Sequence, residues 1–148
     1  MAQSFHVKAP MELTTVSLYL RALGVHRLAV SIFQPTELSQ APDAGKMLAS
    51  TELSPTGTDM KPYDASFETQ PLLLPHKTYW IVLEHLEGFG YLQIRDFEDF
   101  WSTPLLPDTE ERYKDLGIWI PTSRGDGIAF DVNGCQTTAP TLDSNSAL

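Results

Sequence analysis

Histidine and cysteine are the residue types that proteins use most often for catalysis and metal binding, and this chain has few of them. Its four histidines are His6, His26, His76 and His85, and its only cysteine is Cys135. No HExxH, HxH or GxSxG pattern is present, and no base adjoins Cys135 in the sequence. Because His76 falls in a turn and His26 beside a loop, we expect solvent-exposed histidines and a protein that is not an enzyme.

Two acidic runs could supply oxygen ligands for calcium, which takes about six to eight of them, often from loops. The candidate ligands are Asp96 and Asp99 in "RDFEDF" and Asp126 in "RGDGIAFDVNG". Neither run has the spacing of an EF-hand loop. We therefore expect solvated acidic loops and no cofactor, with a structural calcium as the alternative. Glu98 and Asp99 could also form the acid pair of a glycosidase, but carboxylates are abundant throughout this chain.

The aromatic residues are the remaining candidates for binding. One dense apolar cluster lies outside any regular pattern and predicts an interface with another protein. Trp119 is added to the candidates because Ile118 and Ile120 are the expected core positions of its strand, which leaves Trp119 facing outward. The interface candidates are Phe97, Phe100, Trp101, Leu105, Leu106 and Trp119. Exposed aromatic rings also stack on sugars, so Trp101, Tyr113 and Trp119 are the candidates for a carbohydrate site. The alternative is that these rings fill a β core.

The elements that must position these residues are short strands. Period-2 alternation puts Val16, Leu18 and Leu20 on one face of a strand, and likewise Leu28, Val30 and Ile32. In "TYWIVLE", Tyr79, Ile81 and Leu83 share one face while Trp80 and Val82 share the other. Both faces of that strand carry apolar bulk, so we expect Trp80 to pack rather than to contact a ligand.

About eight to ten such strands, separated by Pro- and Gly-rich turns, predict an all-β antiparallel sandwich, jelly-roll-like. One helical turn is expected around "PDTEERY", residues 107–113, with Asp108 as its cap. We place one domain at residues 1–134 and a polar C-terminal arm at residues 135–148.

Composition excludes several classes of partner. The chain has 148 residues, 42% of them hydrophobic and 20% charged, which is typical of a globular protein. Its net charge of −9 argues against sequence-independent binding to nucleic acid and against docking on anionic membranes. We see neither a signal peptide nor an apolar run long enough to span a bilayer. A single cysteine allows no intrachain disulfide, which fits maturation in a reducing cytoplasm.

The order of these signals resembles the small jelly-roll modules of bacteriophage virion proteins and of choice-of-anchor-type bacterial surface proteins. The resemblance spans about residues 2–95 and covers core positions and turns, but no catalytic motif. Its segments are "QSF" at Gln3 to Phe5, "VSLYL" at Val16 to Leu20, V-x-I at Val30 to Ile32, G-x-x-L-A at Gly45 to Ala49, and "LPHKTYWIVL" at Leu74 to Leu83.

The resemblance implies two functions. The first is a structural protein of a phage particle, either a capsid decoration protein or a tail or baseplate accessory protein. Its partners would be other virion proteins and further copies of itself, and it would be assembled in the host cytoplasm. The second is a carbohydrate-binding module that attaches to a glycan of the host receptor or cell surface. Fold alone does not decide between them.

Overall fold

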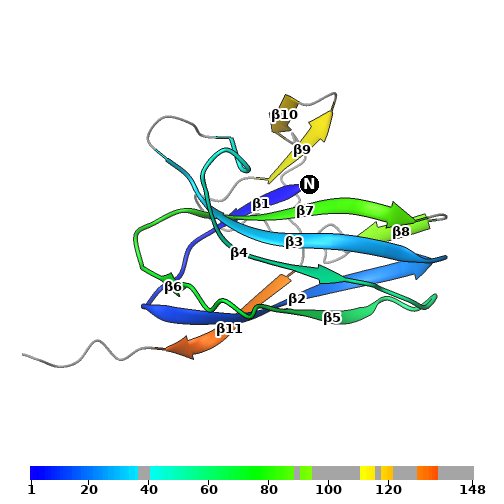
Figure 1. The fold of residues 1–148 in the computed structure, drawn as a ribbon, viewed down its shortest axis with the longest axis horizontal. Helices are drawn as coiled ribbons and strands as arrows, with labels where there is room; N and C mark the ends of the chain where they lie inside the picture. The colour runs from blue at the N-terminus through cyan, green and yellow to red at the C-terminus, as the bar shows by residue number, and fades with distance from the viewer. Residues whose placement is uncertain (37–40, 89–90, 95–110, 116–117, 122–129, 137–148) are drawn as a thin grey trace, which may run out of the picture.

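The computed structural model shows an all-β protein built from two antiparallel sheets packed together (Figure 1), as the sequence predicts. The structure describes residues 1–36, 41–88, 91–94, 111–115, 118–121 and 130–136. Within these ranges there are eleven strands and no helix, so the described residues contain no helix that could cross a membrane. The antiparallel sandwich is therefore confirmed, while jelly-roll connectivity stays a prediction.

The first sheet contains six strands in the order β10-β9-β1-β7-β3-β4. Every neighbouring pair in it is antiparallel. The bounds of its strands, in spatial order, are Ile118–Pro121, Glu111–Asp115, Ala2–Phe5, Tyr79–Gly88, His26–Gln34 and Lys46–Leu53. Strand β7 lies between β1 and β3, and this central position explains why its sequence is apolar on both faces.

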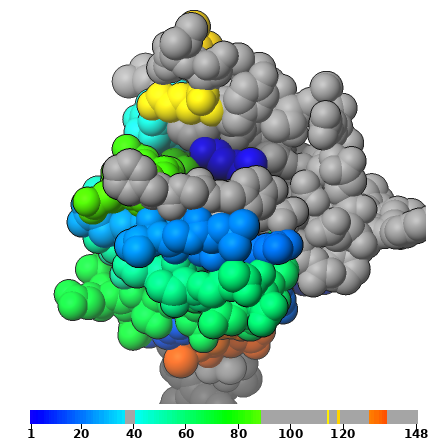
Figure 2. All heavy atoms as spheres, turned by 90° about the vertical axis from the view of Figure 1, so that its right-hand side faces the viewer, coloured from blue at the N-terminus to red at the C-terminus, as the bar shows by residue number. Residues whose placement is uncertain are grey.

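The second sheet is organised around β2, which runs over Met11–Leu23 and pairs with four other strands. These are β5 (Lys61–Ser66), β6 (Leu72–Leu73), β8 (Tyr91–Ile94) and β11 (Phe130–Gln136). The sheet of β2, β5 and β11 occupies the lower part of Figure 1, below β7 and β3. Figure 2 looks onto one end of the sandwich, with β9 in yellow near the top and β11 in orange near the bottom.

The core lies between the sheets and follows the alternation expected from the sequence. Val16, Leu18 and Leu20 of β2 are fully buried, as are Val30 and Ile32 of β3. Tyr79, Ile81 and Leu83 of β7 complete the same cluster. Each fully buried aliphatic side chain contributes about 1.5–3 kcal/mol through removal of apolar surface from water. This core fixes the positions of the strand ends, where the polar sites described below lie.

A bulge in β2 explains why its buried positions change from an odd-numbered residue, Leu13, to even-numbered residues from Val16 onward. The register with β11 shifts between Asn133 and Gly134, so Thr14 has no partner across the ladder. The Thr14 hydroxyl donates to the Asn133 carbonyl over 3.1 Å, and the Thr14 carbonyl accepts from the Phe67 amide over 3.0 Å. The extra residue allows Leu13 and Val16 to be buried on the same side of the strand.

The helical turn expected at residues 107–113 is wrong where the structure describes it, because Glu111 to Asp115 form strand β9. This strand pairs with β1 on one side and with β10 on the other. Pairing on both edges outweighs the local capping signal, since long-range packing routinely overrides weak helix propensity. At the other boundary, β11 continues through Cys135 and Gln136, the first two residues of the expected C-terminal arm.

Candidate functional site

Most of the residues predicted to form a site lie outside the described residues. This holds for five interface candidates and for all three calcium candidates: Phe97, Phe100, Trp101, Leu105, Leu106, Asp96, Asp99 and Asp126. Tyr113 lies on β9 and Trp119 on β10, and only their backbone positions are described. The register pairs Trp119 with Lys114 and Tyr113 with Ile120, so the two aromatic residues are not cross-strand partners. Ile118, one of the two expected core positions of β10, is 67% exposed, so the expectation that it belongs to the core is wrong. The site assignments themselves stay predictions.

Trp80 is the one tryptophan whose side chain is described, and it is a packing residue. It lies on the face of β7 that points away from the main core, yet only 3% of its surface is exposed. Ala2, Val82 and Phe33 form a second, smaller apolar cluster with it. The sequence interpretation of Trp80 as packing is therefore confirmed, and its ring is closed to a sugar ligand.

The same outward face carries a polar pocket beside the second cluster. It has a volume of about 330 Å³ and is lined by Met1, Asp43, Val82, Leu83, Glu84, His85 and Lys114. The Met1 ammonium donates to the Leu83 carbonyl over 3.0 Å, which extends the pairing of β1 with β7. Lys114 of β9 pairs with Asp43 over 2.8 Å, so this ion pair joins β9 to the connection between β3 and β4.

Two histidines meet at the end of the sandwich where β7 finishes. Nδ1 of His26 lies 3.0 Å from Nε2 of His85, and Nε2 of His26 lies 3.2 Å from the Leu23 carbonyl oxygen. A carbonyl can only accept, so the His26 proton sits on Nε2. For two neutral rings, Nδ1 of His26 is then the acceptor and Nε2–H of His85 the donor. The two rings form one hydrogen-bonded chain that ends on the backbone.

His26 is 2% exposed, so the sequence expectation of a solvent-exposed residue is wrong for it. The physical reason is strand phase, because His26 shares its parity with buried Leu28 and Val30. His85 likewise shares the parity of Ile81 and Leu83, although it lies beyond the covered part of β7 and is exposed. The signal was present in the alternation but was hidden by the nearby turn.

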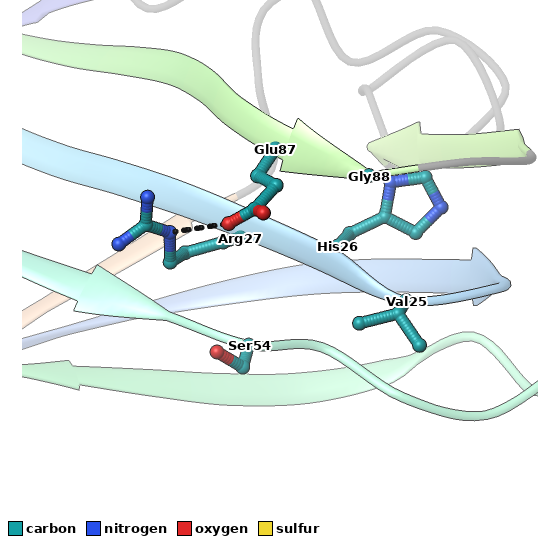
Figure 3. A pocket seen from close by; sticks show the side chains of 6 residues that line it. All are labelled: Val25, His26, Arg27, Ser54, Glu87 and Gly88. Atoms are coloured by element: carbon teal, nitrogen blue, oxygen red, sulfur yellow. Dashed lines mark ion pairs between the residues drawn. The ribbon is translucent and has the colours of Figure 1, made fainter.

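A β-bulge and a glycine make the approach of the two histidines feasible. The register of β3 with β7 shifts between Arg27 and Leu28, which leaves Leu86 without a direct partner. Gly88 has a φ of 152°, and a Cβ built there would lie 2.5 Å from the Val25 oxygen and 2.7 Å from Nδ1 of His26. Figure 3 shows the His26 ring beside Gly88. Only glycine allows the backbone to pass this close.

On the outer face of the same end, an arginine is held between two carboxylates. Arg27 contacts Glu52 over 3.3 Å and Glu87 over 3.4 Å. Arg27 and Glu87, together with Val25, His26, Ser54 and Gly88, line a pocket of about 320 Å³ (Figure 3). All three charged groups are substantially exposed, so the ion pairs orient the side chains and add little stability.

Apolar side chains project into solvent at this end. Val25 in the β2–β3 turn is 77% exposed, Leu23 at the end of β2 is 39% exposed, and Leu86 near the end of β7 is 38% exposed. Gly24, with a φ of 109°, makes the tight turn that presents Leu23 and Val25 together. We call Leu23, Val25 and Leu86 the apolar rim. Isolated exposed apolar residues are ordinary, whereas several at one end of a sandwich are a candidate for a contact surface.

The histidine pair suits hydrogen bonding better than metal binding. The ring centroids are 5.2 Å apart while the nitrogens are 3.0 Å apart, so the two nitrogens face each other directly. The described residues contain no group of three or more His, Cys, Asp or Glu side chains placed to hold a metal ion. Comparison with protein-family models, curated proteins and solved structures finds no match for this chain.

Proposed function

We propose that this chain is a non-enzymatic structural protein of a bacteriophage particle, with a jelly-roll sandwich that acts as a capsid decoration protein or as a tail or baseplate accessory protein. The class of particle comes from the resemblance of residues 2–95 to phage modules. The contact surface is suggested by the apolar rim of Leu23, Val25 and Leu86. A group of apolar side chains on a tight turn is costly in water and is stabilised when a neighbouring protein covers it.

The rim is presented by rigid backbone, which favours a fixed contact over an adaptable one. β2 ends at Leu23 and β3 begins at His26, so the turn between them is held by two long strands. His26 donates to the Leu23 carbonyl directly below the rim, and the amide of Ala22 donates to the Gly57 carbonyl over 3.0 Å. A surface held in this way loses little conformational entropy on binding.

The carbohydrate-binding alternative rests on residues whose side chains the structure does not describe. Trp101, Tyr113 and Trp119 were its candidates, and the described tryptophan, Trp80, is buried. Carbohydrate binding is therefore the second outcome of the test below, to be read from a glycan array with the purified protein.

Incorporation of variants into particles tests the proposal. Particles are produced with the wild-type chain, with Val25→Asp, or with Met47→Asp, and are purified and quantified by immunoblot. Met47 is 55% exposed on edge strand β4, away from the rim, so it is the matched control. A charge in the rim is expected to lower incorporation more than tenfold, because its burial in a contact without a partner is costly. The control should incorporate like wild type.

Two results would overturn this assignment. Equal incorporation of Val25→Asp and wild type would show that the rim is not the contact surface. Absence of the wild-type chain from purified particles, together with binding on the glycan array, would replace the structural proposal with the carbohydrate-binding one. Each variant is first shown to be folded by circular dichroism, so that loss of incorporation is not loss of structure.

A further inference from the structure

Two neighbouring connections at the end of the sandwich opposite the apolar rim carry a group of basic residues, flanked by Glu12 and Glu68. They are the β1–β2 and β6–β7 connections, which lie together at the left of Figure 1. Residues 1–11 and 69–83 include His6, Lys8, His76 and Lys77 but no Asp or Glu. In a chain of net charge −9, two such neighbouring segments create a local positive potential that attracts anions.

Three of these basic residues, His6, Lys8 and His76, line one pocket. It has a volume of about 520 Å³ and is lined by His6, Val7, Lys8, Pro75 and His76. Nδ1 of His6 donates to the Lys77 carbonyl oxygen over 3.0 Å, which joins the two connections across 71 positions of sequence. Because that nitrogen must carry the proton, the hydrogen bond also fixes the tautomer and orientation of the His6 ring.

His76 is held in an unusual backbone conformation at the rim of this pocket. Its φ is 64°, and it is the one non-glycine residue with positive φ among those the structure describes. Glycine adopts this conformation without steric cost, whereas a side chain is disfavoured there by about 1–2 kcal/mol. Residues in disfavoured backbone conformations cluster at ligand sites. At such a site a histidine offsets the backbone cost through the contact of its imidazole with the ligand.

We propose that this pocket binds a phosphate monoester carried on a compact body of about one sugar ring. Lys8 lines the pocket and supplies a permanent positive charge, and Lys77, the neighbour of the lining residue His76, adds a second charge to the same pair of connections. Two such charges favour a dianionic phosphate over a single carboxylate. The His76 imidazole adds a hydrogen-bond donor, while the Nδ1–H of His6 is already bonded to the Lys77 carbonyl. The volume lies in the range of about 300–1,000 Å³ that suits small organic ligands, far larger than one ion requires. Val7 and Pro75 provide apolar surface for the remainder of the ligand.

Isothermal titration calorimetry with three probes tests this assignment: inorganic phosphate, glucose 6-phosphate and glucose. Glucose 6-phosphate should bind at least about tenfold more tightly than inorganic phosphate, because it contacts both the basic groups and the apolar floor. Glucose alone should not bind measurably. Raising the salt concentration should weaken binding of both phosphate probes.

Three variants locate the site. His76→Gly removes the imidazole but keeps a residue that favours the observed backbone, and Lys8→Met removes one permanent charge. Each should weaken glucose 6-phosphate binding about tenfold while unfolding like wild type. Lys46→Met, an exposed lysine on β4, is the matched control and should bind like wild type.

Three outcomes contradict the proposal. The first is absence of binding by both phosphate probes. The second is equal loss of binding in Lys8→Met and Lys46→Met, which would indicate diffuse charge attraction. The third is equal affinity for inorganic phosphate and glucose 6-phosphate, which would reduce the site to one for a free anion.

Discussion

The two ends of this sandwich each carry a pair of histidines, and the pairs differ in burial and in whether the two rings contact each other. His26 and His85 contact each other directly, with His26 buried and its second nitrogen bonded to the backbone. His6 and His76 are both exposed and line an open pocket with Lys8. One pair therefore holds strand ends together beneath an apolar rim, while the other faces solvent at an open pocket.

Strand phase decides the difference. His26 continues the parity of Leu28, Val30 and Ile32, so the strand turns its ring inward. His6 and His76 lie in connections, where no alternation forces a side chain toward the core. The same residue type is thus structural at one end and available for binding at the other, and its place relative to the strands determines which.

The largest effect expected at the apolar end comes from Gly88→Ala. Its Cβ would meet the Val25 oxygen at 2.5 Å in a backbone conformation that side chains rarely adopt. We expect a loss of about 2–4 kcal/mol in the free energy of unfolding. Urea denaturation measures it. Gly57→Ala is the control, since its nearest neighbour is the Lys61 side chain at 3.7 Å, and it should lose only about 1 kcal/mol. Equal losses would contradict the close approach.

The next effect separates the two histidine pairs. His26→Leu keeps a buried side chain but removes both hydrogen bonds, which leaves the Leu23 carbonyl and His85 Nε2–H without this partner. The free energy of unfolding should fall by about 1–3 kcal/mol. His76→Gly should change it by less than about 1 kcal/mol, because glycine suits a φ of 64°. Thermal denaturation tests the difference: a lower melting temperature for His76→Gly than for His26→Leu would contradict the structural role given to His26.

The smallest effect is expected from the exposed ion pairs at the apolar end. Arg27→Ala removes contacts to Glu52 and Glu87. Because these charges are solvated, the free energy of unfolding should fall by less than about 1 kcal/mol, and raising the salt concentration should reduce the difference from wild type. A loss above about 2 kcal/mol in urea denaturation would instead assign Arg27 a structural role comparable with that of His26.

Alternation alone was enough to predict much of the fold. The apolar positions of β2, β3 and β7 identified the inward faces, and all of those named in advance are buried. β9 was missed because its five mixed residues carry no period-2 signal and its pairing with β1 is long-range, although its partner β10 follows directly in the sequence. Local patterns report local preference, and such pairings depend on strands far away in sequence.

The candidate sites were harder to predict, for a different physical reason. The pocket of His6, Lys8 and His76 joins residues about 70 positions apart, and the contact of His26 with His85 joins residues 59 apart. A bulge at Leu86 and the missing Cβ of Gly88 shape the second site, and no sequence period encodes either. The predicted cluster of Phe97, Phe100 and Trp101 lies outside the described residues and stays a prediction.

The central proposal is that this protein is a structural component of a phage particle, and counting the protein in that particle tests it most directly. Quantitative mass spectrometry of purified particles gives its copy number relative to the major capsid protein. We expect a fixed copy number, because particle symmetry sets it. A capsid decoration protein should be present in on the order of hundreds of copies, and a tail or baseplate protein in about three to a few dozen. Absence of the protein from purified particles would contradict the account.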